Sequence, residues 1–266
     1  MGEAYVITSG KGGVGKTTTT ANIGTALAMQ GFRVVLVDAD IGLRNLDVVL
    51  GLENRIVYDL VDLAHERCRM RQALIRDRRL ENLHLLPAAQ TKDKTAVNPE
   101  QMKALCEELK KENDFILMDC PAGIEQGFRN AIAGADKAIV VTTPEVAAVR
   151  DADRIIGLLE ASEIKDPLLV LNRIRPKMVR MGDMLDVEDV IEHLAIDLLG
   201  IVPDDESIII STNKGEPAVL NSASRAGEAY RNIARRIAGD EVPLLDLENR
   251  GGFMNRVRRL LGLRTG

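Results

Sequence analysis

Two lysines stand in a glycine-rich stretch near the start of the chain, which reads Gly10-Lys11-Gly12-Gly13-Val14-Gly15-Lys16-Thr17. The stretch matches G-x-x-x-x-G-K-[ST], a pattern whose backbone N–H groups surround phosphate oxygens. Glycines allow backbone conformations that other residues resist, so successive N–H groups can turn toward one anion. The alternative is a glycine-rich turn with no ligand, but the full octapeptide favours phosphate binding.

The chemistry of such a loop assigns a task to each polar residue in it. We expect Lys16 to reach the β- and γ-phosphates of a nucleotide and Thr17 to bind Mg²⁺. A helix that begins at this point would also direct its positive N-terminus at the anion. The predicted nucleotide-binding residues of the loop are Gly10, Lys11, Gly12, Gly13, Val14, Gly15, Lys16, Thr17 and Thr18.

Three aspartates stand at the ends of apolar runs. Asp38 and Asp40 close Val35-Leu36-Val37-Asp38-Ala39-Asp40, and Asp119 ends a second run before Cys120-Pro121-Ala122-Gly123. An apolar strand followed by aspartate is the Walker B pattern, and carboxylates hold Mg²⁺, often through water. We predict Thr17, Asp38 and Asp119 as the residues around the metal. Taken singly, each aspartate could instead cap a strand end.

These residues need a scaffold that brings strand ends together, and the rest of the chain predicts one. Short β-branched runs at 4–8, 34–38, 83–87, 115–119, 138–142, 168–172 and 199–203 read as strands. Helices are expected at 16–30, 99–112, 145–161, 187–194 and 227–238. This alternation predicts an α/β fold with a mostly parallel, twisted sheet and helices on both faces. Ligands of such sheets bind beyond the carboxyl ends of the strands.

Bulk composition agrees with one large globular domain. The 266 residues are 45% hydrophobic and 28% charged, with 3% aromatics and no Trp, so the core must be aliphatic. A net charge of −5 disfavours general nucleic-acid binding, and no specific nucleic acid is expected. The three cysteines lack a CxxC pair, which is typical of a reducing cytoplasm. The sequence contains neither a signal-peptide pattern nor an apolar run long enough to span a bilayer.

The C-terminal part changes character. We predict an ATPase domain at 1–239, an acidic linker at 240–252 and an amphipathic tail helix at 253–266. On a helical wheel the apolar tail residues occupy about one half, with two arginines opposite them and a third at the border. The predicted membrane-binding residues are Phe253, Met254, Arg256, Val257, Arg258, Arg259, Leu260, Leu261 and Leu263. Such a helix suits an anionic membrane surface, although a terminal helix packed on the domain is the alternative.

The second lysine of the loop carries a resemblance. KGGVGKTT, with Lys11 before Lys16, resembles the deviant Walker A loop of the ParA/MinD family of P-loop NTPases. The resemblance implies that Lys11 reaches the phosphates of a partner subunit in an ATP-bound homodimer. It makes VDAD a switch region in which Asp40 positions the attacking water, and MDCPAG a second switch region. The catalytic residues expected from it are Lys11, Lys16 and Asp40, with ATP and Mg²⁺ as cofactors.

The same resemblance assigns the base-binding side of the site. Asn172 corresponds to the family's adenine-binding asparagine, and Pro203 and Asp205 belong to the loop on the other side of the base. An NKxD guanine motif is absent from the sequence, which favours ATP over GTP. Asp151 matches a position near the dimer interface, and a solvated helix carboxylate is an equally good interpretation.

The loop and the basic tail together are most similar to the septum-site branch of the family. That branch implies a cytoplasmic protein that becomes peripheral on the inner face of the cell membrane in its ATP state. Its implied partners are a MinC-like division inhibitor and MinE or another topological regulator. A flagellar-number regulator and a ParA-like ATPase that partitions DNA or cargo are alternatives from the same family. An iron protein with Cys120 near a cluster and a non-catalytic binding module are further alternatives.

Overall fold

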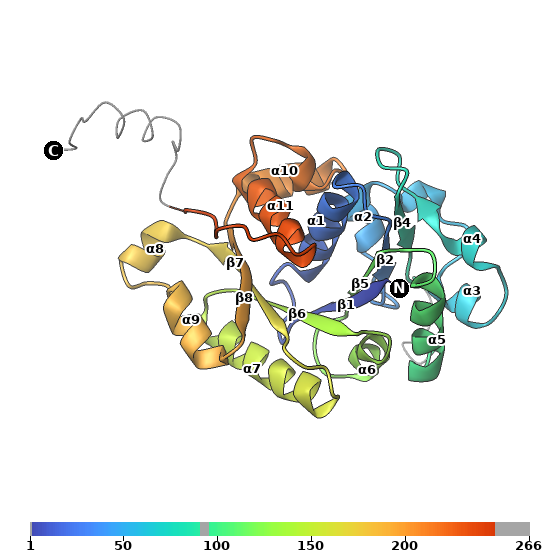
Figure 1. The fold of residues 1–266 in the computed structure, drawn as a ribbon, viewed down its shortest axis with the longest axis horizontal. Coiled ribbons are helices and arrows are strands. Elements are labelled where there is room, and N and C mark those ends of the chain that lie inside the picture. Colours follow the sequence, from blue (N-terminus) through green and yellow to red (C-terminus); the bar gives the residue numbers. More distant parts are fainter. Residues whose placement is uncertain (1, 91–95, 248–266) are drawn as a thin grey trace.

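The computed structural model describes residues 2–90 and 96–247, and its strands form one sheet (Figure 1). The strand order is β3-β4-β2-β5-β1-β6-β7-β8, and β3 runs antiparallel to β4 whereas every other neighbouring pair is parallel. The strands are β1 (Glu3–Thr8), β2 (Val34–Asp38), β3 (Ile75–Arg76), β4 (Leu83–Leu86), β5 (Phe115–Asp119), β6 (Lys137–Thr142), β7 (Leu168–Ile174) and β8 (Asp197–Pro203). All seven predicted strands are therefore confirmed, and β3 is an addition.

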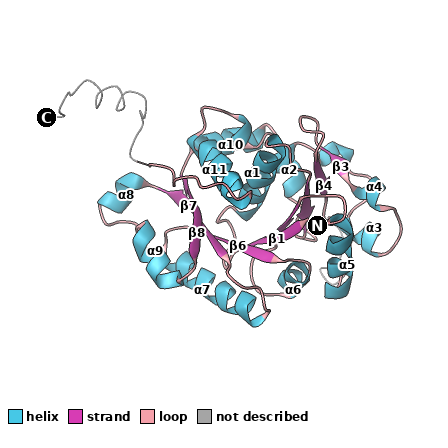
Figure 2. Cartoon of the chain, in the orientation of Figure 1, coloured by secondary structure: helices cyan, strands magenta, loops and turns pink. Residues whose placement is uncertain are grey.

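Helices cover both faces of this sheet (Figure 2). On one face α1 (Lys16–Met29) and α11 (Arg225–Ile237) pack on apolar residues such as Leu36 and Leu117. On the other face α5 (Pro99–Leu109), α6 (Gln126–Ala133), α7 (Val146–Ala161) and α9 (Val187–Leu194) enclose the second half of the core. Strands buried on both faces need apolar residues at successive positions, which explains the unbroken runs in β2 and β5.

The five predicted helices correspond to α1, α5, α7, α9 and α11, with ends that differ by at most a few residues. Shorter elements complete the fold. They are α2 (Leu46–Leu50), η1 (Glu53–Arg55), α3 (Leu60–Ala64), α4 (Met70–Ala73), α8 (Pro176–Arg180), α10 (Glu206–Asn213) and η2 (Ala218–Leu220).

Register fixes where the polar strand ends meet. Asp38 of β2 and Asp119 of β5 are paired residues on adjacent parallel strands, and Ile7 of β1 pairs with Asp119 on the other side. The turn after β1 therefore leaves the sheet beside both aspartates. This carboxyl edge is where the sequence predicts the ligand.

The described chain continues past α11 along the domain surface. Leu245 and Leu247 pack against the core, and the guanidinium of Arg236 donates to the carbonyls of Val242 and Pro243. The first part of the predicted linker is thus held against α11. Residues 248–266, which include the whole predicted tail, lie outside the described residues. Within residues 2–90 and 96–247, helices that are long and apolar enough to cross a membrane are absent.

Candidate nucleotide site

The loop between β1 and α1 wraps around the N-terminus of that helix. Gly13 and Gly15 have φ values of 80° and 99°, in the left-handed region that favours glycine. Gly15 is also close-packed, because a Cβ built on it would lie 2.4 Å from the side-chain nitrogen of Asn172. A Cβ on Gly10 would lie 2.1 Å from the carbonyl oxygen of Asp151 in α7. These positions explain why the loop needs glycine at both ends.

Lys16 points into the protein. Its side chain is 8% exposed, and its ammonium donates a hydrogen bond of 3.0 Å to the hydroxyl of Ser9. Ser9 in turn donates to the carbonyl of Lys11 at 2.8 Å, so the two bonds of Ser9 tie the ends of the loop together. The ammonium is therefore positioned at the centre of the loop, where the phosphates are expected.

Lys11 has the opposite environment. Its side chain is 48% exposed, and its ammonium lies 3.6 Å from the carboxylate of Glu145, the residue that precedes α7. A pair this exposed stabilises the fold by at most about 1 kcal/mol. Lys11 is therefore a cation at the surface that one weak ion pair directs toward α7.

Asp119 lies directly beneath the start of α1. It is 2% exposed and is hydrogen-bonded by the hydroxyls of Thr17 and Thr20, the latter at 3.3 Å. Burial raises the pKa of Asp119 to about 6, although the two hydroxyls and the charge of Lys16 oppose that effect. Thr20, one helical turn after Lys16, was not among the predicted residues.

Asp38 is fully buried and is held by backbone groups. Its carboxylate accepts hydrogen bonds from the N–H groups of Asp40, Asn45 and Leu46 at 3.0–3.1 Å. Burial, followed by the charge of Asp119, raises the pKa of Asp38 to about 8. The contacts of Asp38 also position Asp40 at the entrance to the following loop.

Two adjacent buried carboxylates and a threonine hydroxyl form a set of hard oxygen donors, the type that Mg²⁺ prefers. Burial raises the pKa values of Asp38 and Asp119, so keeping both carboxylates ionised is costly, and a divalent cation beside them would lower that cost. The residues therefore fit a magnesium ion beside Thr17. The three predicted metal residues are brought together, and their individual roles remain predictions.

Asn172, two residues before the end of β7, contacts the loop. Its amide donates a hydrogen bond of 2.7 Å to the carbonyl of Val14, and its oxygen accepts a hydrogen bond from the N–H of Arg173. Pro203 ends β8, and the carboxylate of Asp205 accepts hydrogen bonds from the groups that begin α10 and α11. The adenine-side role of these residues stays a prediction, and Asp205 has a structural task that the sequence did not reveal.

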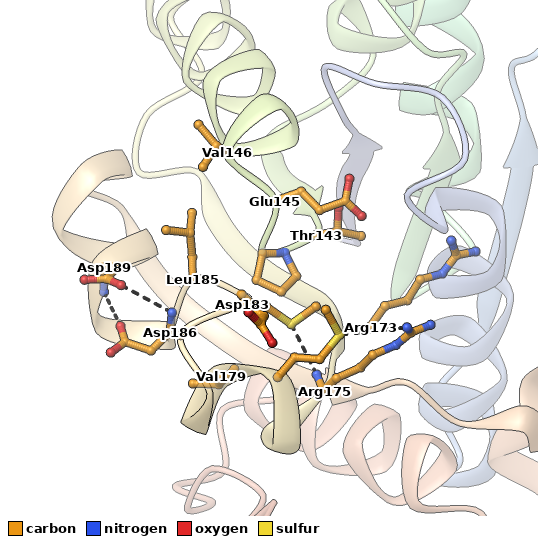
Figure 3. Close-up of a pocket in the computed structure, with 14 residues that line it drawn as sticks. Thr143, Glu145, Val146, Arg173, Arg175, Val179, Asp183, Leu185, Asp186 and Asp189 are labelled. Carbon is orange, nitrogen blue, oxygen red and sulfur yellow. Dashed lines mark hydrogen bonds between the residues drawn. The ribbon is translucent and has the colours of Figure 1, made fainter.

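A pocket of about 550 Å³ lies beside the end of β7, next to Asn172 in the chain (Figure 3). It lies between the start of α7, the end of β7 and the α8–α9 segment, and Glu145 and Arg173 are among its lining residues. The phosphate-loop residues do not line it, but Glu145, the partner of Lys11, does. The pocket thus borders the nucleotide site on the side to which Lys11 is directed.

Three residues of the site were missed by the sequence analysis: Ser9, Thr20 and Glu145. Ser9 and Thr20 had a recognisable signal, because Ser9 is a polar end to an apolar strand and Thr20 lies four residues after Lys16. Glu145 had none, since its contact joins residues far apart in the chain.

Comparisons with known proteins agree with this geometry. Residues 5–218 match the CobQ/CobB/MinD/ParA nucleotide-binding domain. The septum site-determining protein MinD of Bacillus subtilis is 62% identical over 268 residues, which cover 100% of both chains. The Synechocystis protein of the same name is 57% identical and covers 98% of this chain and 99% of its own.

Solved structures give the same result. MinD in the MinC:MinD complex of Aquifex aeolicus superposes with a TM-score of 0.86 at 49% identity, over 92% of this chain and 99% of that one. MinD of Pyrococcus horikoshii, complexed with Mg-ADP, has a TM-score of 0.81 at 30% identity, over 90% and 97%. The expected cofactors, ATP and Mg²⁺, are thereby confirmed for the family. The P-loop fold, the site and these relatives together show that the chain belongs to the MinD septum site-determining ATPases of the ParA/MinD family.

Proposed function

We propose that this ATPase is a dimerisation switch that binds the inner face of the cell membrane in its ATP state. There it positions the division site by recruiting an inhibitor of division-ring assembly. Hydrolysis returns it to a form that leaves the membrane. The proposal joins three parts, namely the nucleotide site, the exposed lysine of the loop and the C-terminal tail.

The site residues divide the chemistry between them. Lys16 and the loop N–H groups hold the phosphates, and Thr17, Asp119 and Asp38 would hold Mg²⁺, which would neutralise charge on the phosphate oxygens. Asp40 orients the attacking water, a task that remains once the nucleotide is held. Asp38 and Asp119 are costly to keep ionised side by side, and a bound metal would offset that cost.

One observation carries the dimer proposal: the two lysines of one loop face different environments. Lys16 is buried and bonded to Ser9, whereas Lys11 is half exposed and, among the described residues, is paired with Glu145 alone. A lysine that is directed out of its own site is available to a nucleotide in a second subunit. Its positive charge would stabilise the transition state of phosphoryl transfer, as an arginine finger does.

Mixing two inactive variants tests this role. Lys11→Ala removes the donated lysine, and Asp40→Ala removes the water-positioning group of the receiving site. If Lys11 acts across the interface, a mixed dimer contains one complete site, and mixing restores part of the ATP turnover. If Lys11 acts in its own subunit, each site of the mixed dimer lacks one group, and turnover stays at the level of the single variants. Each variant must bind ATP on its own, which calorimetry measures.

The membrane part of the proposal rests on the tail, from Phe253 to Leu263. A single short amphipathic helix binds lipid weakly, and two copies in one dimer bind much more strongly because the second insertion is intramolecular. Sedimentation with phosphatidylglycerol vesicles tests this, with ATP or ADP, for the full chain and a chain that ends at Asn249. At physiological ionic strength, binding that needs both ATP and the tail is expected. Equal binding of the two chains would return the tail to a packing role.

The partner proposal rests on relatives. The Aquifex MinD was solved in complex with MinC, which supports a MinC-like inhibitor as a partner of this chain. MinE or another topological regulator would then stimulate release. The high identity to septum-site proteins along the whole chain disfavours a flagellar regulator or a DNA-partitioning ATPase. Capture of purified MinC by vesicle-bound protein with ATP, and not with ADP, is the expected result.

A further inference from the structure

Arginines gather at the β3 edge of the sheet. This edge is opposite the β8 edge, on which α11 and the last described residues pack. Residues 67–79 contain six arginines and one aspartate, whereas the formal net charge of the whole chain is −5. These residues form α4, the edge strand β3 and the turn after it. We call the exposed arginines here the edge cluster, which consists of Arg55, Arg67, Arg69, Arg71, Arg76 and Arg78.

Ion pairs neutralise little of this charge. Arg67 lies 3.0 Å from Asp62, and Arg76 lies 3.9 Å from Glu81, whose side chain is 90% exposed. Among residues 2–90 and 96–247, the other four members of the edge cluster lack an acidic partner. Residues 55–81, which include every member of the cluster, contain seven arginines and five carboxylates, so this stretch is net positive in a protein that is acidic as a whole.

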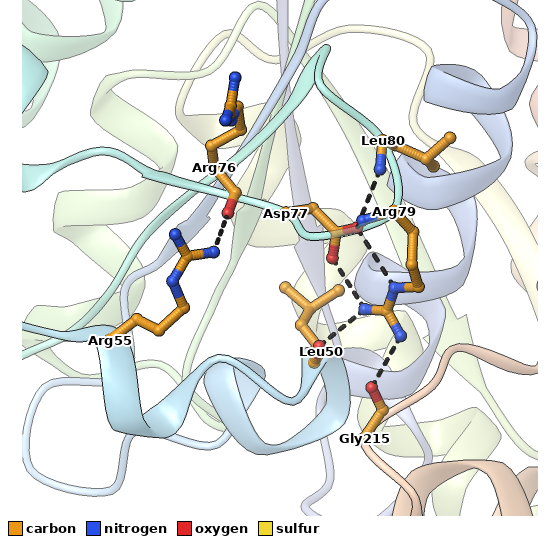
Figure 4. A network of polar contacts seen from close by, with 7 residues as sticks. All are labelled: Leu50, Arg55, Arg76, Asp77, Arg79, Leu80 and Gly215. Carbon is orange, nitrogen blue, oxygen red and sulfur yellow. Dashed lines mark hydrogen bonds and ion pairs between the residues drawn. The ribbon is translucent and has the colours of Figure 1, made fainter.

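The turn that presents part of the cluster is held rigidly (Figure 4). Asp77, 4% exposed, accepts from the N–H of Arg79 at 2.7 Å and from its guanidinium at 2.7 Å. The same guanidinium donates to the carbonyls of Leu50 and Gly215 at 2.7 and 2.9 Å. Arg79 is thus a structural residue that joins three segments of the chain, and the turn needs no further ordering when a ligand arrives.

Three other arginines surround a hollow beside that turn. The guanidinium of Arg55 donates a hydrogen bond of 2.9 Å to the carbonyl of Arg76, which keeps the two residues adjacent (Figure 4). Together with Arg78 they line a depression of about 330 Å³, in which Glu81 is the one exposed carboxylate. Guanidinium groups fit phosphate oxygens in bidentate geometry, so this arrangement is suited to phosphate-bearing partners.

The chemistry of the edge favours a lipid surface over a nucleic acid. Tyr58 is the single Phe, Tyr or Trp in residues 55–83 and it packs against the core, so this stretch lacks the row of aromatic rings on which successive bases stack. The helix within the cluster, α4, has four residues, which is too short to fill a DNA groove. A membrane of anionic lipids requires neither feature, because lysines or arginines near its surface attract mobile headgroups one by one.

We propose that the edge cluster is a second membrane contact, which binds anionic lipid headgroups independently of the tail. This inference rests on the proposed membrane function. β3 and β8 are the two ends of the strand order, and residues 240–247 leave the domain along α11, which packs on β8. Contacts at both edges of the sheet would limit rotation of the domain on the membrane and present the same face to partners.

The test compares a double charge reversal in the edge cluster with a single charge reversal elsewhere on the surface. Arg71→Glu/Arg78→Glu removes two members without an acidic partner, and Lys165→Glu, on the loop after α7, is the control for added negative charge. Full-length protein with ATP is sedimented with phosphatidylglycerol and with phosphatidylcholine vesicles. We expect the double variant to bind phosphatidylglycerol vesicles at least about tenfold more weakly, from roughly fivefold per arginine, and the control to bind nearly as the original protein does. Salt should reduce the difference.

Three results would overturn the proposal. They are unchanged vesicle binding by the double variant, an equal loss in the Lys165→Glu control, and arginine-dependent retardation of duplex DNA with vesicle binding intact. The chain ending at Asn249 separates this inference from the tail proposal. At low ionic strength the chain ending at Asn249 should still bind phosphatidylglycerol vesicles weakly. The double variant made in that shortened chain should lose this binding. If the shortened chain binds as the full chain does, the tail proposal fails and the edge-cluster proposal remains. If the shortened chain does not bind and the full-length double variant binds as the original protein does, the edge-cluster proposal fails alone.

Discussion

Asp205 was predicted to contact the nucleotide, yet its carboxylate already serves two helices. One oxygen accepts from the N–H of Ser207 at 2.9 Å and so caps α10. The other accepts from the hydroxyl of Ser224 at 3.1 Å and the N–H of Ala226 at 3.0 Å, at the start of α11. Replacing Asp205 should therefore lower the free energy of unfolding more than it lowers ATP affinity.

The expected size follows from the bonds lost. An N-cap contributes about 1 kcal/mol, and a hydrogen bond to a charged group contributes about 1.5–3 kcal/mol. Asp205→Ala should cost about 3 kcal/mol, since water replaces part of what is lost, and lower Tm by on the order of 5–10 °C for a chain of this length. Asp205→Asn keeps one acceptor oxygen and should cost about half as much.

Thermal and urea unfolding of both variants measure the cost, and calorimetry measures ATP affinity below the transition. Asp204→Asn is a matched control, because its carboxylate makes an exposed pair with Arg175 worth at most about 1 kcal/mol. The pKa of Asp205 is lowered by its hydrogen bonds, against burial, so the stabilisation is present above pH 4 or so and is lost as pH falls further. A normal Tm with ATP affinity reduced tenfold or more would refute the capping argument and return Asp205 to the nucleotide.

Three other substitutions probe the site and its scaffold. Gly15→Ala adds a Cβ 2.4 Å from the amide of Asn172, at a φ of 99° that disfavours alanine. ATP affinity measured by calorimetry should therefore fall at least about tenfold. Unchanged affinity would mean that the loop accommodates the added Cβ. Gly157→Ala, in α7 with open space around the new Cβ, should raise the free energy of unfolding by about 0.5–1 kcal/mol in urea, and a decrease would contradict the local packing. Without metal or nucleotide, burial raises the pKa values of Asp38 and Asp119 to about 8 and 6, so the free energy of unfolding should fall as pH rises from about 4 to 8. Asp38→Asn should flatten this pH dependence when unfolding is measured across that range. An unchanged dependence would exclude Asp38 as its source.

The long elements were predictable because each carries a strong and redundant pattern. Val34–Asp38 and Phe115–Asp119 are apolar at successive positions, and only a strand covered on both faces requires that pattern. The phosphate loop added an anchor, since its function demands a strand before it and a helix after it. Once those strands were placed as parallel neighbours, the meeting of Asp38 and Asp119 followed from the register.

The short elements were not predictable for the opposite reason. α3 and α4 have five and four residues, which is too few to show a helical period. α10 contains Ile208, Ile209 and Ile210, a β-branched run that favours a strand. It is helical because the Asp205 cap lies at its start, and that cap belongs equally to α11, 19–21 residues further along the chain. A contact made in the folded state thus overrides the local preference.

The same distinction separates the two halves of the site. Lys16 and Thr17 lie in the phosphate-loop motif, which predicts both their chemistry and their positions, and Asp119 is predicted by the apolar strand that it ends. Lys11 is specified by a motif too, but its environment depends on Glu145, which the chain supplies 134 residues later. That pair is weak, so a second subunit that offers a triphosphate would compete for Lys11 at little cost. The ATPase cycle proposed here therefore depends on an ion pair that is strong enough to direct the lysine toward α7 and weak enough to release it.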